Sequence, residues 1–171
     1  MKSEKILKGM HIIAWIVFVG LLIKSGSILV SYLVSIKNPE AAKNLFGGLN
    51  LFEYRNFDFI QYTFITMYKV GLFLIEAYIA FLVTKLLASL NLKKPFNSNV
   101  YFLMKKISYA ILYLWGVAII HNAHVRFIGR RYNFSMDLFS SDFIFLAGVI
   151  LIFSQIVKKG IEIQSENDLT I

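Results

Sequence analysis

Apolar residues fall into four long runs separated by short polar segments. The runs cover about residues 9–34, 61–84, 107–123 and 143–157. A helix of about 20 apolar residues crosses the roughly 30 Å hydrocarbon core of a bilayer. The strict alternation of apolar and polar residues that barrel strands require is missing from these runs. The pattern therefore predicts an all-α integral membrane protein whose four transmembrane helices form a bundle.

The organisation of the chain is predicted to be simple. No Pro/Gly/Ser-rich linker divides its 171 residues, so we expect a single membrane domain over 1–171 with a cytoplasmic tail over 158–171. The basic N-terminal segment leads into a run longer than the core of a signal peptide, which has about 7–15 apolar residues. The first run is therefore expected to be an uncleaved span.

Composition supports a membrane protein and excludes several kinds of site. The chain is 57% hydrophobic and 16% charged, whereas soluble domains carry about 25% charged residues. It has no cysteine, which excludes disulfides, thiolate nucleophiles and cysteine-based metal sites. The net charge is +8, but the basic residues are scattered over short loops. We interpret them as topology signals and contacts with anionic lipids, and expect no direct binding of nucleic acid.

The basic residues between the runs predict the orientation, because positively charged loops stay on the cytoplasmic side. One side carries ten lysines: Lys2, Lys5, Lys8, Lys85, Lys93, Lys94, Lys105, Lys106, Lys158 and Lys159. The other side carries six basic residues: Lys37, Lys43, Arg55, Arg126, Arg130 and Arg131. Both termini are therefore predicted to be cytoplasmic, with the Arg130-Arg131 pair as the main evidence against this orientation.

The first connection on the opposite side is predicted to be structured. Asn38-Pro39 is typical of a helix start and Gly47-Gly48 of a helix end, so a short helix is expected near residues 39–46. Over residues 49–59, apolar and aromatic residues alternate with polar ones. We interpret this segment as an aromatic belt at the membrane interface, with a ligand lid as the alternative.

Three ionisable residues lie within the predicted spans, where charge is costly: Lys24, Lys69 and Glu76. Lys69 and Glu76 are seven residues apart, which places them on one helix face about 10 Å apart in height. One interpretation is a polar track for a proton, an ion or an anionic headgroup. The other is that both lysines extend outward to the interface while Glu76 hydrogen-bonds a Tyr, Ser or Thr on a neighbouring helix.

His121 and His124 lie three residues apart near the end of the third run, and with Arg126 they form a candidate outer polar cluster. Asn122 and Asp137 are the residues that would complete it. Two histidines make a weak metal site, so histidines that meet water at the interface are the favoured interpretation. No cofactor and no metal site are expected. No phosphate-binding loop, nucleophile elbow or metalloprotease motif occurs, and the protein is expected not to be an enzyme.

Two segments on the predicted cytoplasmic side carry the most specific sequence. Residues 91–100 read Asn-Leu-Lys-Lys-Pro-Phe-Asn-Ser-Asn-Val. Pro95 ends one helix, and Asn97 or Ser98 caps the next. At the C-terminus, Lys158 and Lys159 precede an acidic end with two apolar residues, Leu169 and Ile171. This end is suited to dock on the positive connection or to bind a cytoplasmic partner.

Together these segments resemble the family of small bacterial membrane proteins known as domain of unknown function 2975. The resemblance rests on Lys94-Pro95-Phe96 with Asn99-Val100, and on the closing Ser165-Glu-Asn-Asp-Leu-Thr-Ile171. Members of that family are often encoded beside a small Cro/repressor-type helix-turn-helix protein. The resemblance therefore implies a membrane component that signals to, or restrains, a transcriptional regulator.

The leading hypothesis is a four-helix protein of the bacterial cytoplasmic membrane that senses or regulates through cytoplasmic contacts. Its candidate partner-contact residues are Lys93, Lys94, Phe96, Asn99, Glu166, Asn167 and Asp168. The alternative is a small transporter or transporter subunit that uses Lys24, Lys69 and Glu76. Membrane lipids are expected partners. The sequence leaves both a monomer and a homo-oligomer possible. Gly20 and Gly116 allow close approach of helices, but no G-x-x-x-G pair lies within a span.

Overall fold

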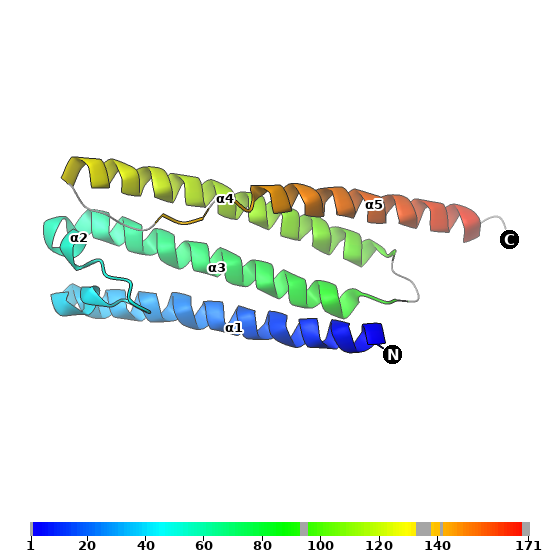
Figure 1. Cartoon of the computed structure of the whole chain (residues 1–171), viewed down its shortest axis with the longest axis horizontal. Coiled ribbons are helices and arrows are strands. Elements are labelled where there is room, and N and C mark those ends of the chain that lie inside the picture. Colours follow the sequence, from blue (N-terminus) through cyan, green and yellow to red (C-terminus); the bar gives the residue numbers. More distant parts are fainter. Residues whose placement is uncertain (1, 93–95, 133–137, 141, 169–171) are drawn as a thin grey trace. The chain divides into compact units, whose positions relative to one another are not determined.

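A computed structural model describes residues 2–92, 96–132, 138–140 and 142–168. The described chain is helical, without a strand (Figure 1). Its elements in order are α1 (Lys2–Lys37), the 3-10 helix η1 (Pro39–Lys43), α2 (Phe52–Phe57), α3 (Phe59–Ser89), α4 (Ser98–Tyr132) and α5 (Ile144–Asp168).

Four of these helices are long and apolar enough to cross a membrane, which confirms the predicted all-α membrane fold. The segments are Glu4–Lys37 of α1, Phe59–Ser89 of α3, Ser98–Tyr132 of α4 and Ile144–Glu166 of α5. Each helix extends beyond the apolar run that predicted it. Hydropathy marks the part suited to hydrocarbon, whereas the backbone hydrogen bonds of a helix continue into the polar flanks.

The chain divides into two compact units, and three of the long helices contribute residues to both. The first unit comprises Met1–Phe18, Tyr78–Trp115 and Ser141–Ile171, and the second comprises Val19–Ala77 and Gly116–Ser140. The first unit thus contains α5 and the first half of α4. The second unit contains η1, α2 and the second half of α4.

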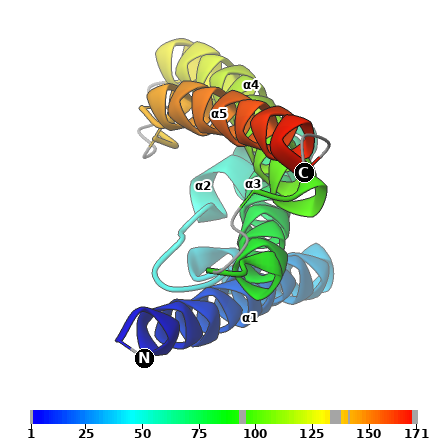
Figure 2. The same cartoon turned by 90° about the vertical axis from the view of Figure 1, so that its right-hand side faces the viewer.

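The core of the first unit joins α3, α4 and α5. Its buried apolar residues are Leu82, Leu103, Ile107, Ile111 and Ala147. Ser108 is also buried, and its hydroxyl donates a hydrogen bond of 2.8 Å to the carbonyl of Ala147. This contact holds the start of α5 against α4, and within the first unit α5 lies beside the first half of α4 in both views (Figures 1 and 2).

The second unit contains polar side chains within its core. The Ser35 hydroxyl of α1 donates to the carbonyl of Tyr32, so it accepts a hydrogen bond of 2.6 Å from the Tyr62 hydroxyl of α3. The first apolar run is interrupted by the polar stretch Lys24-Ser25-Gly26-Ser27. The Ser25 hydroxyl in this interruption donates to the carbonyl of Val70 at 3.2 Å. Helix α1 therefore continues through this interruption, because its serine is paired with α3.

The connection from α1 to α3 is structured, as predicted, but its helix is shorter. The Asn38 side chain caps η1 by accepting from the backbone N–H of Glu40, and η1 ends at Lys43 instead of near residue 46. Gly47 and Gly48 then adopt φ values of 56° and 87°. These values favour glycine, because a Cβ atom clashes with the backbone in this region.

The segment that follows departs in part from the predicted interfacial belt. Leu51 and Tyr54 are buried in the core of the second unit, whereas Phe57 and Phe59 are exposed. Arg55 donates to the carbonyls of Ser35 and Ile36 at 2.9 and 3.2 Å. It therefore caps the C-terminal end of α1, where carbonyls lack partners within the helix.

Candidate functional site

The connection between α3 and α4 meets α5 within the first unit at Phe96. The Phe96 ring lies directly over Gly160 of α5, so that a Cβ atom added to this glycine would be 2.5 Å from Cδ1 of the ring. Such a distance is shorter than real contacts allow. The ring is still 41% exposed. The connection that carries part of the family resemblance therefore packs on α5 five residues before the closing segment that begins at Ser165, and it presents an aromatic side chain at the surface.

Hydrogen bonds hold the start of α4 in place beside this point. The Asn97 side chain accepts from the backbone N–H of Val100 at 2.9 Å, so Asn97 is a cap of α4. The Asn99 side chain donates to the Ser89 hydroxyl at 2.7 Å and thereby joins the beginning of α4 to the end of α3. Asn99, predicted as a partner contact, thus has a structural bond as well. Lys93 and Lys94 lie outside the described residues.

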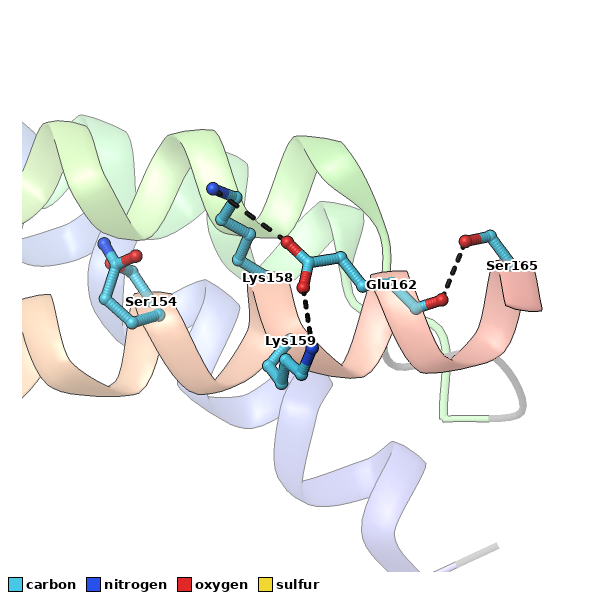
Figure 3. A network of polar contacts seen from close by, with 6 residues as sticks. Ser154, Lys158, Lys159, Glu162 and Ser165 are labelled. Carbon is cyan, nitrogen blue, oxygen red and sulfur yellow. Dashed lines mark hydrogen bonds and ion pairs between the residues drawn. The ribbon is translucent and has the colours of Figure 1, made fainter. Parts of the chain in front are cut away.

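The C-terminal part of α5 carries an exposed network of charged residues (Figure 3). The Glu162 carboxylate forms ion pairs with the ammonium groups of Lys158 at 4.0 Å and Lys159 at 3.1 Å. The Ser165 hydroxyl donates a hydrogen bond of 2.7 Å to the backbone carbonyl of Glu162. Helix α5 continues through Asp168, so Glu166 lies on a helix. Asn167 and Asp168 are helical in their backbone, and their side chains lie outside the described part of the chain.

The ionisable residues of the spans lie in the second unit. The Lys24 ammonium is 4.0 Å from the centre of the Phe73 ring. Lys69 is only 8% exposed, so it does not extend outward as one interpretation required. Within the described residues, Glu76 has neither a hydrogen bond nor an ion pair, which differs from the hydrogen bond expected for it. A cation–π contact on Lys24 and a half-buried carboxylate therefore share this part of the unit.

The histidines of α4 are buried more deeply than sequence reasoning predicted. His121 is 0% exposed, and its Nδ1 lies 3.1 Å from Oδ1 of Asn122. Asn122 also exchanges two hydrogen bonds with the backbone of Phe139, which fixes its amide orientation. Because Oδ1 can only accept, Nδ1 of His121 carries the hydrogen. His121 therefore serves an internal polar contact, and the expectation that it meets water is wrong.

His124 is engaged in a similar way, and Arg126 is not part of this group. Nε2 of His124 lies 2.7 Å from Oε1 of Gln61, 63 positions earlier in the chain. The Tyr68 ring contacts both imidazoles edge to face. Arg126 is exposed and lines a separate groove. The predicted cluster thus divides into the buried His121, the partly exposed His124 and the exposed Arg126, because the five residues from His121 to Arg126 turn a helical side chain by about 140°.

Sequence reasoning missed Gln61, Tyr68 and Phe139 as partners of the histidines. Nothing in their local sequence predicts these contacts, because each depends on which faces of α3 and α4 meet. In the part of the chain that the structure describes, no group of three or more His, Asp or Glu side chains is placed to hold a metal ion.

These helices define the class of the molecule as a multi-pass helical membrane protein. The chain belongs to the family described as protein of unknown function (DUF2975), which it matches over residues 50–171. The match confirms the resemblance inferred from the two segments at residues 91–100 and 158–171, and both segments lie within the matched range. Neither the search of curated proteins nor the search of solved structures found a match.

Proposed function

We propose that this protein is a non-enzymatic regulator of the bacterial cytoplasmic membrane that binds a small helix-turn-helix protein on its cytoplasmic side. The binding surface consists of Phe96 and the α5 residues Gly160, Glu162 and Glu166, here called the Phe96–α5 surface. The observation that carries the proposal is the Phe96 ring packed on Gly160 and still 41% exposed. An exposed aromatic ring held against a helix is a suitable anchor for a partner, because such rings contribute much of the binding energy at interfaces.

The charges of α5 support the same surface. Acidic residues near the C-terminal end of a helix oppose its dipole and cost up to about 1 kcal/mol each. Glu166 lies in the last turn of α5, so the helix dipole does not favour it there. Glu162 lies one turn earlier and pairs with lysines of its own helix. Carboxylates there suit the basic face of a DNA-binding protein. Electrostatic complementarity favours the encounter, while Phe96 supplies the apolar contact.

Co-purification with a transcriptional readout tests this proposal. The full chain is expressed with the helix-turn-helix protein encoded beside it, purified in mild detergent, and examined for the retained regulator and for a reporter under its control. Phe96→Ala and Gly160→Leu should each reduce the retained regulator about tenfold or more, because an aromatic anchor contributes about 2 kcal/mol or more. Both should alter reporter expression.

Gly148→Ala is the matched control. Gly148 lies on the same helix, and a Cβ atom there meets nothing within 4 Å. This variant should retain the regulator. Retention by Phe96→Ala and Gly160→Leu at the level of the unchanged protein would contradict the proposal, and so would a wild-type chain that retains no regulator.

A second candidate function is movement of protons or ions through the membrane. It is favoured by one observation in the second unit, where the half-buried Glu76 carboxylate makes neither a hydrogen bond nor an ion pair within the described residues, while Lys24 contacts the Phe73 ring. Transport predicts that Glu76→Gln abolishes ion or proton flux in proteoliposomes and leaves the regulator bound. Glu53→Gln, which removes a carboxylate outside the long helices, serves as the control and should leave flux unchanged.

A further inference from the structure

Three arginines lie together on the last turns of α4. Arg126, Arg130 and Arg131, with Ala123 and Phe127, line an open groove of about 660 Å³. Arg126 and Arg130 are four residues apart and therefore lie on the same face of the helix. Among the groove-lining residues that the structure describes, none is acidic. The groove is strongly cationic as a result.

These guanidinium groups lack acidic partners within the described part of the chain. Arg131 lies 5.4 Å from the centre of the Tyr132 ring, and neither Arg126 nor Arg130 makes a hydrogen bond or an ion pair there. Like charges one turn apart destabilise a helix. Arg130 and Arg131 gain some compensation from the dipole at the helix end. Arg126 lies nearly two turns before that end, where the dipole effect has largely fallen off.

The position of the groove along α4 matches the depth of lipid headgroups. The apolar run of this helix ends near Ala123. At 1.5 Å per residue, Arg126 lies about 4.5 Å and Arg130 about 10 Å beyond that point. The headgroup layer occupies about 5–7 Å on each side of the hydrocarbon core. Arg126 therefore lies within this layer, and Arg130 lies just beyond it, from where a long side chain reaches back because helical side chains tilt toward the N-terminal end. Phe127, between the arginines, is 62% exposed, which is favourable where apolar and polar phases meet.

We propose that this groove binds the phosphodiester headgroup of an anionic membrane phospholipid. Arg126 and Arg130 bind the phosphate oxygens, because the guanidinium fork matches phosphate geometry and is always charged. An acyl chain lies along Ala123 and Phe127. This apolar part of the groove favours a lipid over a soluble anion. The bound headgroup also neutralises part of the charge that opposes the predicted orientation.

Native mass spectrometry and thermal unfolding of the full chain in neutral detergent test the site. The probes are short-chain phosphatidylglycerol, phosphatidylcholine with the same acyl chains, and glycerol 3-phosphate without chains. Phosphatidylglycerol should form retained adducts and raise the melting temperature. The other two probes should do neither at the same concentration. A shift of equal size with glycerol 3-phosphate would identify a soluble anion as the ligand and overturn the proposal.

Variants of equal charge distinguish a site from general attraction. Arg126→Gln/Arg130→Gln should raise the phosphatidylglycerol concentration needed for half-saturation about tenfold or more, because it removes the charge-assisted hydrogen bonds to the phosphate. Lys105→Gln/Lys106→Gln removes the same charge from the first half of the same helix and should leave binding unchanged. Arg126→Lys/Arg130→Lys should restore part of the affinity. Unchanged binding in the arginine variant, or an equal loss in the lysine variant, overturns the proposal.

Discussion

The second half of α4 and the end of α5 differ in where their polar side chains find partners. In the second unit, His121 and Asn122 of α4 are bonded inside the structure, and Asn122 pairs with the backbone of Phe139. In the first unit, the ion pairs that Glu162 of α5 makes within the described residues are with exposed lysines of its own helix. Buried polar groups must be satisfied because no water reaches them. Exposed ones contribute little to stability and remain accessible to a partner.

The largest effect on stability is expected at Asn122. Replacement by leucine removes both contacts with Phe139 and leaves the buried Nδ1 of His121 without its acceptor. Asn122→Leu should lower the free energy of unfolding by about 2–3 kcal/mol, because buried polar groups left unpaired are costly. Unfolding in mild detergent measures this loss. Asn99→Leu is the control, because Asn99 lies on the same helix and makes an exposed hydrogen bond. An equal loss in both variants would remove the contrast between the two regions.

Tyr62 tests the same rule in the core between α1 and α3. Tyr62→Phe deletes the hydroxyl bonded to Ser35 and keeps the buried ring. We expect a loss of about 1 kcal/mol, within the range measured for neutral hydrogen bonds. Thermal unfolding of this variant beside Tyr113→Phe, whose ring is exposed, isolates the contribution of the buried hydroxyl. A larger loss in Tyr113→Phe would refute it.

Ser108 tests whether the loss in free energy of unfolding depends on the burial of a polar side chain or on the unit in which it lies. It lies in the first unit, but it is buried and donates to the Ala147 carbonyl. Ser108→Ala should cost about 0.6 kcal/mol, the average for hydrogen bonds between membrane helices. This loss should exceed that of any exposed pair on α5. If Ser108→Ala proves neutral in the unfolding measurement, burial alone does not explain the contrast.

The smallest effect is expected at Glu162. Glu162→Gln breaks both exposed ion pairs with Lys158 and Lys159. The loss should be at most about 0.5 kcal/mol and should decrease with added salt, because exposed pairs are weak and screened. Unfolding at low and high ionic strength measures it. A salt-independent loss above about 1 kcal/mol would mean that this network stabilises the fold.

Much of the local structure was predictable from particular residues. Asn38 and Asn97 occupy the caps expected of asparagine, and Gly47-Gly48 adopts positive φ values, although the short helix that it was expected to end stops earlier, at Lys43. The position of Arg55 was also visible, but it was counted only as a topology charge. Its bonds to the carbonyls of Ser35 and Ile36 depend on how the connection folds back onto α1.

The candidate sites were less predictable, because hydropathy describes the preference of a segment for lipid and not its neighbours. A buried face and a lipid-facing face of a membrane helix are similarly apolar. The burial of His121, Leu51 and Tyr54 therefore had no local signal. The contact of Phe96 with Gly160 joins segments more than 60 residues apart, so neither segment predicts it alone.

The sequence by itself determined that this is a membrane protein, and it determined its four spanning helices and its family. These properties depend on the length and polarity of segments and on short motifs. Only the tertiary structure decided which polar residues are paired, which are buried and which remain exposed. These properties depend on the faces that distant helices present to one another. The tertiary structure likewise decided that Phe96 packs on α5. It also decided that the groove arginines of α4 have no acidic partner among the described residues.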